Sequence, residues 1–451
     1  MAGGTRFRLF PQLAQGWREP ELVEVSLPPG AIGPGPQDAR MYVANAVDKP
    51  QPYDAPERLP PYDGPLHPDA MPGPGGHFDH IPEETPQFLA AHLYGSVRRV
   101  LDIWEGYLGH RVAWWHAARF PRLELVPLLR WGNAQSGFGF LEMGLRWTRT
   151  GKVQPLCLNF DVVAHEVGHA ILFSVLGGPA PGRLTGAFLA FHEAFSDLVA
   201  AFSALHFRSV EARLLQETEG NLYALNLVSR LGELSDIEQV RVLDNEVRLA
   251  DLEGVALQPD GRWADPLRLG RRHYFVAAPV TGAVWDCFVE LFQDGLVARR
   301  VIAPSLDARG WDRAAVAAAL APLQRGSAAA LARRSGAFVE YLREARDLTS
   351  LALAHCLRRL DPDDLCFEAV AARFVEAMDG LGQAHNRAAF EENFLWRGIG
   401  LRAPGGRVAA PDGAGPPALP RDGGACPACR NPFAVLSAGR LLDHRHREAA
   451  I

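Results

Sequence analysis

The segment from Phe160 to Leu176 constrains the fold of this chain more than any other, because it is almost entirely apolar yet carries ionisable groups. Residues 161–170 read Asp-Val-Val-Ala-His-Glu-Val-Gly-His-Ala, and a glycine pair follows the segment. Apolar residues over this length, closed by glycine, predict a buried helix. Burying an imidazole or a carboxylate costs free energy unless the group is paired or binds a metal ion. The fold must therefore supply interior partners for His165, Glu166 and His169.

The spacing of the two histidines predicts a metal site. His165 and His169 are four residues apart and so lie on one face of a helix, where two imidazoles can bind one Zn²⁺. Glu166 is adjacent to His165, beside the metal rather than on it, and can take a proton from water there. A catalytic zinc has three protein ligands and one open position. The third ligand is therefore expected from another segment.

A second apolar helix, predicted from Ala187 to Phe207, carries two further carboxylates. We expect Glu193 to be the third zinc ligand, because a carboxylate on a buried helix is costly unless it is paired or ligated. Asp197 follows one turn later on the same face. It is placed to accept the second ring N–H of a zinc histidine and so to fix its tautomer. The sequence thus predicts a ligand set of His165, His169 and Glu193.

The combination of these two segments resembles thermolysin-like metallopeptidases, the neutral proteases of the gluzincin class. That family joins its zinc helix to a helix reading Gly-Ala-x-Asn-Glu-Ala-x-Ser-Asp. Here Gly186-Ala187 precedes Glu193-Ala-x-Ser-Asp197 at a spacing three residues longer, and His192 replaces the Asn. The resemblance covers about residues 86–400 and is specific around 161–197.

The resemblance implies an α+β fold of two lobes. A β-rich N-terminal lobe would carry the zinc helix, and the C-terminal lobe would be mostly helical. The uneven distribution of proline and glycine suggests where these parts end. We expect a Pro/Gly-rich N-terminal extension (1–85), an N-terminal lobe (86–177), a helical C-terminal lobe (178–402) and a Pro/Gly-rich linker and tail (403–451).

Apolar periodicity places further elements along the chain. We expect strands at Leu22–Leu27, Tyr42–Val47, Leu123–Leu129 and Gly137–Met143. We expect helices at Gln87–Leu108, Arg313–Leu320, Ser327–Ala345, Thr349–Arg359 and Phe367–Met378.

The segment Trp131-Gly132-Asn133-Ala134 precedes the zinc helix. The family has an edge strand with Asn-Ala at this place, which binds the substrate backbone by strand addition. By resemblance, the Asn133 side chain and the Ala134 backbone would bind substrate here. The alternative is an ordinary loop asparagine.

The chain departs from the family in the C-terminal lobe. The family has a histidine there that donates to the tetrahedral oxyanion, held by an aspartate a few residues before it. The nearest match is His273, with Asp265 upstream, but the next helix is expected to start at Thr281, too far downstream. His273 is therefore either the oxyanion donor or a surface histidine. Arg248 is an equally open match to the family's arginine, and residues 198–215 lack the family's calcium-binding acidic clusters.

These residues predict zinc-dependent hydrolysis of peptide bonds in a peptide or protein substrate. Glu166 would move the proton, and His273 would stabilise the oxyanion. Two alternatives remain. The chain could be a catalytically inactive binding or scaffold protein that keeps the fold. It could also be a gluzincin aminopeptidase, although the Gly-x-Met-Glu-Asn strand of that class is missing and Phe140–Met143 has its Glu and Met in the wrong order.

Composition excludes several other classes. The 451 residues carry a net charge of -6, which gives no electrostatic case for binding nucleic acid. No stretch of about 18 apolar residues is free of charge, so we expect no membrane span. Residues 1–20 lack the apolar core of a signal peptide, so we expect a cytoplasmic location, or secretion by a non-standard route.

The tail contains four potential metal ligands. Cys426, Cys429, His444 and His446 have a spacing compatible with a small second zinc site. One Cys-x-x-Cys pair is weak support, and a redox pair or an unpaired tail is favoured. We therefore predict one metal ion, in the site on the two helices.

Overall fold

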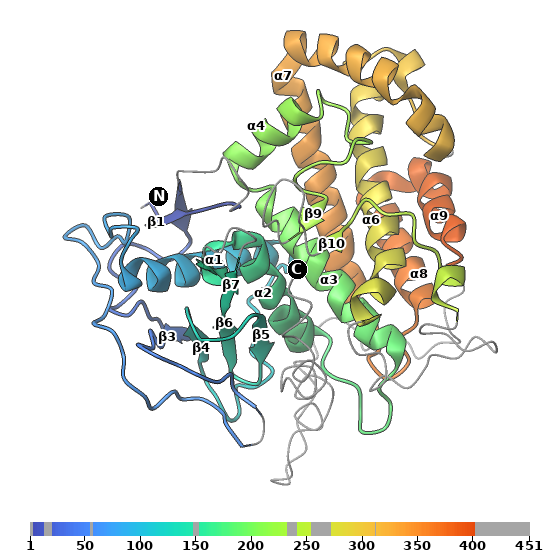
Figure 1. The fold of residues 1–451 in the computed structure, drawn as a ribbon. Coiled ribbons are helices and arrows are strands. Elements are labelled where there is room, and N and C mark those ends of the chain that lie inside the picture. Colours follow the sequence, from blue (N-terminus) through green and yellow to red (C-terminus); the bar gives the residue numbers. More distant parts are fainter. Residues whose placement is uncertain are drawn as a thin grey trace.

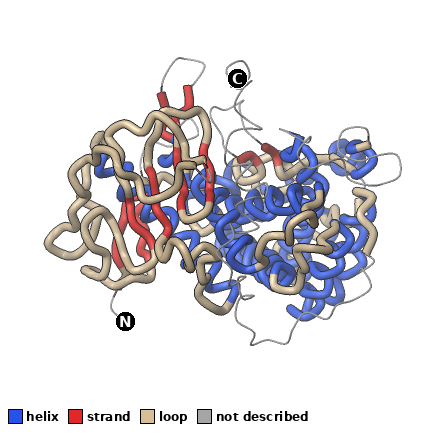
Figure 2. The backbone as a smooth tube through the Cα atoms, turned by 90° about the horizontal axis from the view of Figure 1, so that it is seen from below, coloured by secondary structure: helices blue, strands red, loops and turns tan. Residues whose placement is uncertain are grey.

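A computed structural model describes residues 3–12, 20–54, 57–147, 153–231, 241–253, 272–311 and 313–401. The α+β class is confirmed, since strands gather in the first part of the chain and long helices form the rest (Figure 1). A second view shows most of the strands at one end of the molecule and most of the helices at the other (Figure 2).

The strands are short. They are β1 (Thr5–Leu9), β2 (Glu21–Val25), β3 (Met41–Val43), β4 (Leu123–Val126), β5 (Ala134–Gly137), β6 (Phe140–Met143), β7 (Leu145–Trp147), β8 (Val153–Pro155), β9 (Arg230–Leu231) and β10 (Arg241–Val242). The described helices are α1 (Pro86–Leu108), α2 (Phe160–Val175), α3 (Gly186–Ala204), α4 (Arg208–Glu217), α6 (Arg272–Ala298), α7 (Arg313–Leu357), α8 (Phe367–Met378) and α9 (Arg387–Trp396).

The largest sheet has the order β3-β4-β6-β5. The first three of these strands run parallel, and β5 is an antiparallel edge strand. Leu141 and Met143 face the main core, whereas Phe140 packs in a small cluster on the opposite face. The single strand expected over Gly137–Met143 is wrong, because Gly139 turns the chain with a φ of 93° and makes a hairpin.

The helix α1 matches its predicted range closely. It begins after Thr85, whose side chain accepts from the backbone N–H of Phe88, and it ends at Gly109 in the left-handed conformation. Its core face carries Leu93, Val97 and Trp104, which are completely buried, as the helical periodicity of the sequence predicts.

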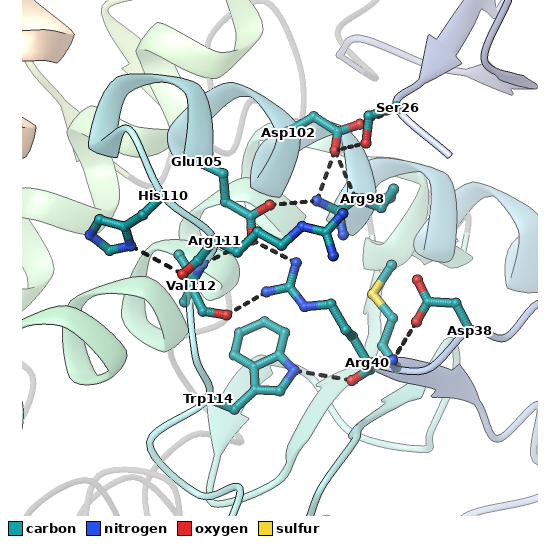
Figure 3. Close-up of polar contacts among 11 residues, drawn as sticks. Ser26, Asp38, Arg40, Arg98, Asp102, Glu105, His110, Arg111, Val112 and Trp114 are labelled. Carbon is teal, nitrogen blue, oxygen red and sulfur yellow. Dashed lines mark hydrogen bonds and ion pairs between the residues drawn. The ribbon is translucent and has the colours of Figure 1, made fainter. Parts of the chain in front are cut away.

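The N-terminal residues are joined to α1 by charge as well as by apolar packing (Figure 3). Arg98 binds Asp102 and Glu105 on its own helix. The same two carboxylates accept from the N-terminal part of the chain, Asp102 from Ser26 and Glu105 from Arg40. The apolar side chains of β1 and β2 enter the core shared with α1. The N-terminal segment is thus packed on α1 by both kinds of contact.

Two glycines explain why the predicted helix boundaries downstream are wrong. The helix expected to start near Thr281 begins at Arg272, and Gly282 lies inside it because a β-carbon there would be 2.5 Å from the buried Arg397 guanidinium. The three helices expected between residues 313 and 359 fall within α7, which is interrupted by a single kink at Arg334 (φ -139°, ψ 40°). Gly326 does not break it, since a β-carbon at that position would meet Leu306.

Two described helices are long and apolar enough to cross a membrane, α3 and the part of α6 from Phe275 to Ala298. The tested window of α3 is wholly buried inside the fold, and that of α6 is 78% buried. Core helices of this kind pass the same test, so length and composition give only weak support for a membrane span.

Candidate metal centre

The residues His165, His169 and Glu193 meet where α2 crosses α3. Their exposed fractions are 7%, 6% and 4%. The two Nε2 atoms are 3.0 Å apart, and the Glu193 carboxylate oxygens lie 3.4 Å from Nε2 of His165 and 3.8 Å from Nε2 of His169. Among the residues that the structure describes, this is the one group of three or more potential ligands close enough to share a metal ion.

The separations between these donors fit a tetrahedral metal ion. Ligand bonds of about 2.0–2.2 Å at tetrahedral angles place neighbouring donors roughly 3.3–3.6 Å apart. The imidazole nitrogens are 3.0 Å apart, and the shortest carboxylate contacts, 3.4 Å from Oε2 to His165 and 3.8 Å from Oε1 to His169, lie around that range. Two nitrogens and one carboxylate also leave a fourth position for another ligand.

Hydrogen bonds at the far side of each ring assign the tautomers. Nδ1 of His165 is 2.8 Å from the Asp197 carboxylate and so carries the proton. Nδ1 of His169 is 2.9 Å from the Ser196 hydroxyl. That hydroxyl donates to the carbonyl oxygen of His192, so its oxygen accepts from His169. Both Nε2 atoms therefore present lone pairs to each other.

Two lone pairs facing each other inside a protein are unfavourable unless a positive charge lies between them. A bridging proton or a metal ion would supply that charge. The carboxylate of Glu193 lies within 3.4 Å of Nε2 of His165, which adds a third, anionic donor that a metal ion uses as a ligand. The donor set therefore fits a bound metal ion.

Glu166 lies on α2 between the two histidines and is 7% exposed. On an α-helix it is rotated about 100° from His165 and about 60° from His169. This spacing predicts that its carboxylate lies on the same side of the helix as His165 and His169.

The side chain of His192 is a further part of the centre, which the sequence reasoning noted only as a replacement. Its Nδ1 lies 3.1 Å from Nδ1 of His169 and 3.7 Å from the Glu193 carboxylate. Its position directly before Glu193 could have indicated that it lies in the centre. Ser196 was also not predicted as a site residue, although its place in the Ser-Asp pair of the second motif could have indicated it.

An aromatic group joins the metal centre to the β5–β6 hairpin. Phe173 lies one turn beyond His169. The centroid of its ring is 6.3 Å from that of the His192 ring and 5.3 Å from that of the Trp115 ring. Trp115 in turn contacts Phe138, which lies in the hairpin turn, at 4.8 Å. These rings form a chain of aromatic contacts from His192 to the hairpin turn.

The predicted substrate segment leads into the edge of the sheet. Ala134 is the first residue of β5, and Asn133 precedes it and is half-buried. The carbonyl oxygen of Asn133 accepts from the backbone N–H of Gly144, so it points toward the residue that follows β6. Because backbone groups alternate in direction along an antiparallel strand, those of Ala134 point away from β6. In the described part of the chain β5 pairs with β6 alone.

Several predicted residues are not brought to the centre or lie outside the described residues. His273 is in the first turn of α6, but its side chain lies outside the described part, as does Asp265. The four tail residues Cys426, Cys429, His444 and His446 lie there too. Arg248 packs its guanidinium 3.8 Å over the Trp396 ring.

Comparisons with known proteins give a fold likeness only. No protein-family model matches the chain, and no curated protein matches its sequence. A solved structure similar to it is the precursor of protealysin, a metalloproteinase from Serratia proteamaculans, with a TM-score of 0.44 and 11% identity. That match covers 84% of this chain and 90% of the other. At this distance it assigns the chain to no family.

Proposed function

We propose that this protein is a zinc-dependent endopeptidase of the thermolysin-like kind. The observation that carries the proposal is the convergence of two imidazole lone pairs and the Glu193 carboxylate on one buried point. Helical spacing puts the base expected for hydrolysis, Glu166, on the same side of α2. A protein that only kept the fold would not need this carboxylate beside its ligands.

The donor set favours zinc among the common metal ions. Two imidazoles and one carboxylate in a tetrahedral arrangement with an open position are typical of catalytic zinc sites. When bound, zinc acts as a Lewis acid that polarises a carbonyl and lowers the pKa of water. His165, His169 and Glu193 would hold it, and Asp197 and Ser196 would keep the two imidazoles in the required tautomers.

The remaining steps belong to residues of the chain. Glu166 would take the proton of the attacking water and pass it to the leaving amine. The backbone of Ala134 and the side chain of Asn133 would bind the substrate main chain as an added strand. His273 would donate to the oxyanion.

The test uses the purified full chain and its metal content. We expect about one zinc per chain and cleavage of peptides at internal bonds, read by mass spectrometry of the products. Glu166→Gln should keep the zinc and lose roughly 10²–10⁴-fold in kcat. Glu193→Gln should lose the zinc as well.

Three results would contradict parts of this proposal. A wild-type protein without zinc would remove the metal centre as a whole. Equal activity in wild type and Glu166→Gln would remove the role of the base. Stepwise removal of N-terminal residues would identify an aminopeptidase rather than an endopeptidase.

A further inference from the structure

The segment 48–53 of the N-terminal region lies against β5 and the chain that leads into it. The backbone N–H of Arg130 donates to the carbonyl oxygen of Lys49, and the Arg130 guanidinium pairs with Asp48. Further along, the Gln135 amide donates to the carbonyl oxygen of Tyr53. Residues on both sides of Asn133-Ala134 are thus held by the same short segment.

At the centre of this contact is a buried ion pair. Nζ of Lys49 lies 2.9 Å from the Glu142 carboxylate, and the exposed fractions of the two residues are 5% and 0%. The other carboxylate oxygen of Glu142 accepts from the backbone N–H of Tyr53 at 2.8 Å and from the Gln135 amide at 2.7 Å. Gln135 and Glu142 are direct cross-strand partners on β5 and β6. The carboxylate therefore joins segment 48–53 to the edge strand.

The ammonium group fits this place for a specific reason. Its three protons face the Glu142 carboxylate, the carbonyl oxygen of Gln51 at 3.2 Å and the ring of Tyr53, whose centroid is 3.6 Å away. Among the 46 Lys and Arg residues of the chain, only Lys49 and Lys152 are lysine. A planar guanidinium with five N–H donors would need more acceptors than this pocket shows.

A buried charge pair of this kind is weak as a source of stability, because desolvation offsets most of the attraction. Once formed, however, the pair is costly to separate, since removing one partner leaves the other charge buried and unpaired. The pair is therefore better suited to holding a strand in one place than to stabilising the fold as a whole.

We infer that Lys49 is a positioning residue for substrate binding, acting through Glu142 and Gln135 to hold the edge strand β5 in the place where a peptide would pair with it. The inference rests on the proposed peptidase function, which assigns the substrate main chain to Ala134. It adds a residue that is remote in sequence from both the metal ligands and the edge strand.

The experiment compares four full-length proteins: wild type, Lys49→Met, Lys49→Met with Glu142→Gln, and Arg98→Met. Arg98 is the matched control, since it is also a buried cation, at 3% exposed, but its carboxylate partners Asp102 and Glu105 lie on α1 (Figure 3). Each protein is measured for zinc content, for kcat and KM on one peptide, and for hydrogen exchange of the peptide spanning residues 130–137.

We expect Lys49→Met to raise KM roughly tenfold, about the loss of one backbone hydrogen bond, with kcat and zinc content within about twofold of wild type. Exchange in 130–137 should become faster. The double variant should return both KM and the exchange of 130–137 toward wild type. It removes the unpaired charge and keeps an acceptor for Tyr53 and Gln135. Arg98→Met should change neither KM nor the exchange of 130–137.

Unchanged exchange and KM in Lys49→Met would overturn the inference. An equal effect in Arg98→Met would show a general loss of stability instead. A double variant as impaired as the single one would show that Lys49 does not act through Glu142. If the wild type holds no zinc or cleaves no peptide, the proposed function fails, and exchange alone still decides whether Lys49 holds β5.

Discussion

A β-carbon built on Gly168 of α2 would lie 2.7 Å from the Cα atom of Ser196 in α3, so the two helix backbones are in direct contact. This contact sits one residue from His169 and three residues from Glu193. His165, His169 and Glu193 can meet because the two helices approach this closely.

Gly168→Ala should therefore separate the helices and weaken metal binding. We expect the zinc dissociation constant to rise about 10-fold or more, since ligand geometry at such sites tolerates only small shifts. A competition assay with a chromophoric chelator measures this. Gly106→Ala in α1 is the control, because a β-carbon at that position would have no atom within 4 Å and the exchange should stabilise a helix slightly. Equal dissociation constants in Gly168→Ala and wild type would show that the contact is not needed.

His192→Leu should also reduce zinc affinity, because it removes the ring that lies 3.1 Å from Nδ1 of His169. Loss of such an outer contact typically costs 10–100-fold in metal affinity. His192→Asn keeps a polar group and should lose less. His92→Leu removes another buried histidine, one that accepts from Phe10 in the N-terminal region, and should leave the dissociation constant unchanged. An unaffected His192→Leu protein would exclude His192 from the centre.

Removal of the metal should lower the unfolding temperature by a few degrees. A bound ion would separate two lone pairs 3.0 Å apart, and a ligand at 100 times its dissociation constant stabilises the folded state by about 2.7 kcal/mol. Thermal unfolding with and without chelator, followed by zinc addition, measures the effect. Glu193→Gln should show a much smaller response, and a response equal to that of wild type would place the ion elsewhere.

The buried carboxyl of Glu290 should make the stability of the folded protein depend on pH, independently of the metal centre. Burial raises the pKa of its carboxyl to about 7, and its side chain accepts from Asn393. A carboxyl whose pKa is raised in the folded state contributes stability below its unfolded pKa of about 4.3, and this stability is lost as the pH rises through 7. The loss by pH 8 is on the order of 3 kcal/mol.

Glu290→Gln keeps the acceptor for Asn393 and cannot ionise. We expect it to match wild type near pH 4 and to be more stable at pH 8, as measured by urea unfolding at both values. A difference between the two proteins that does not vary with pH would contradict the raised pKa of Glu290.

The glycines show where reasoning from sequence reached its limit. A glycine inside a helical pattern indicates either a break or a close approach, and the sequence alone does not distinguish them. Gly177 follows α2 and ends it with a φ of 83°, as predicted. Gly282 and Gly326 lie inside helices because Arg397 and Leu306 occupy the space that a side chain would need. Those neighbours are distant in sequence.

The clustering of His165, His169 and Glu193 was predictable for the opposite reason. The helical period alone places His165 and His169 on one face, whatever the rest of the chain does. The costs of burying Glu193 and Asp197 then required partners nearby. Both inferences use local geometry and the free energy of burial, which the residue types and their spacing already contain.

The tertiary structure decided how distant segments meet. Which ring nitrogens carry protons depends on Asp197 and Ser196 approaching from α3. The ion pair of Lys49 with Glu142 joins residues that are 93 positions apart in the chain. Local propensity carries no information about such contacts, because their free energy exists only after the separate elements have packed together.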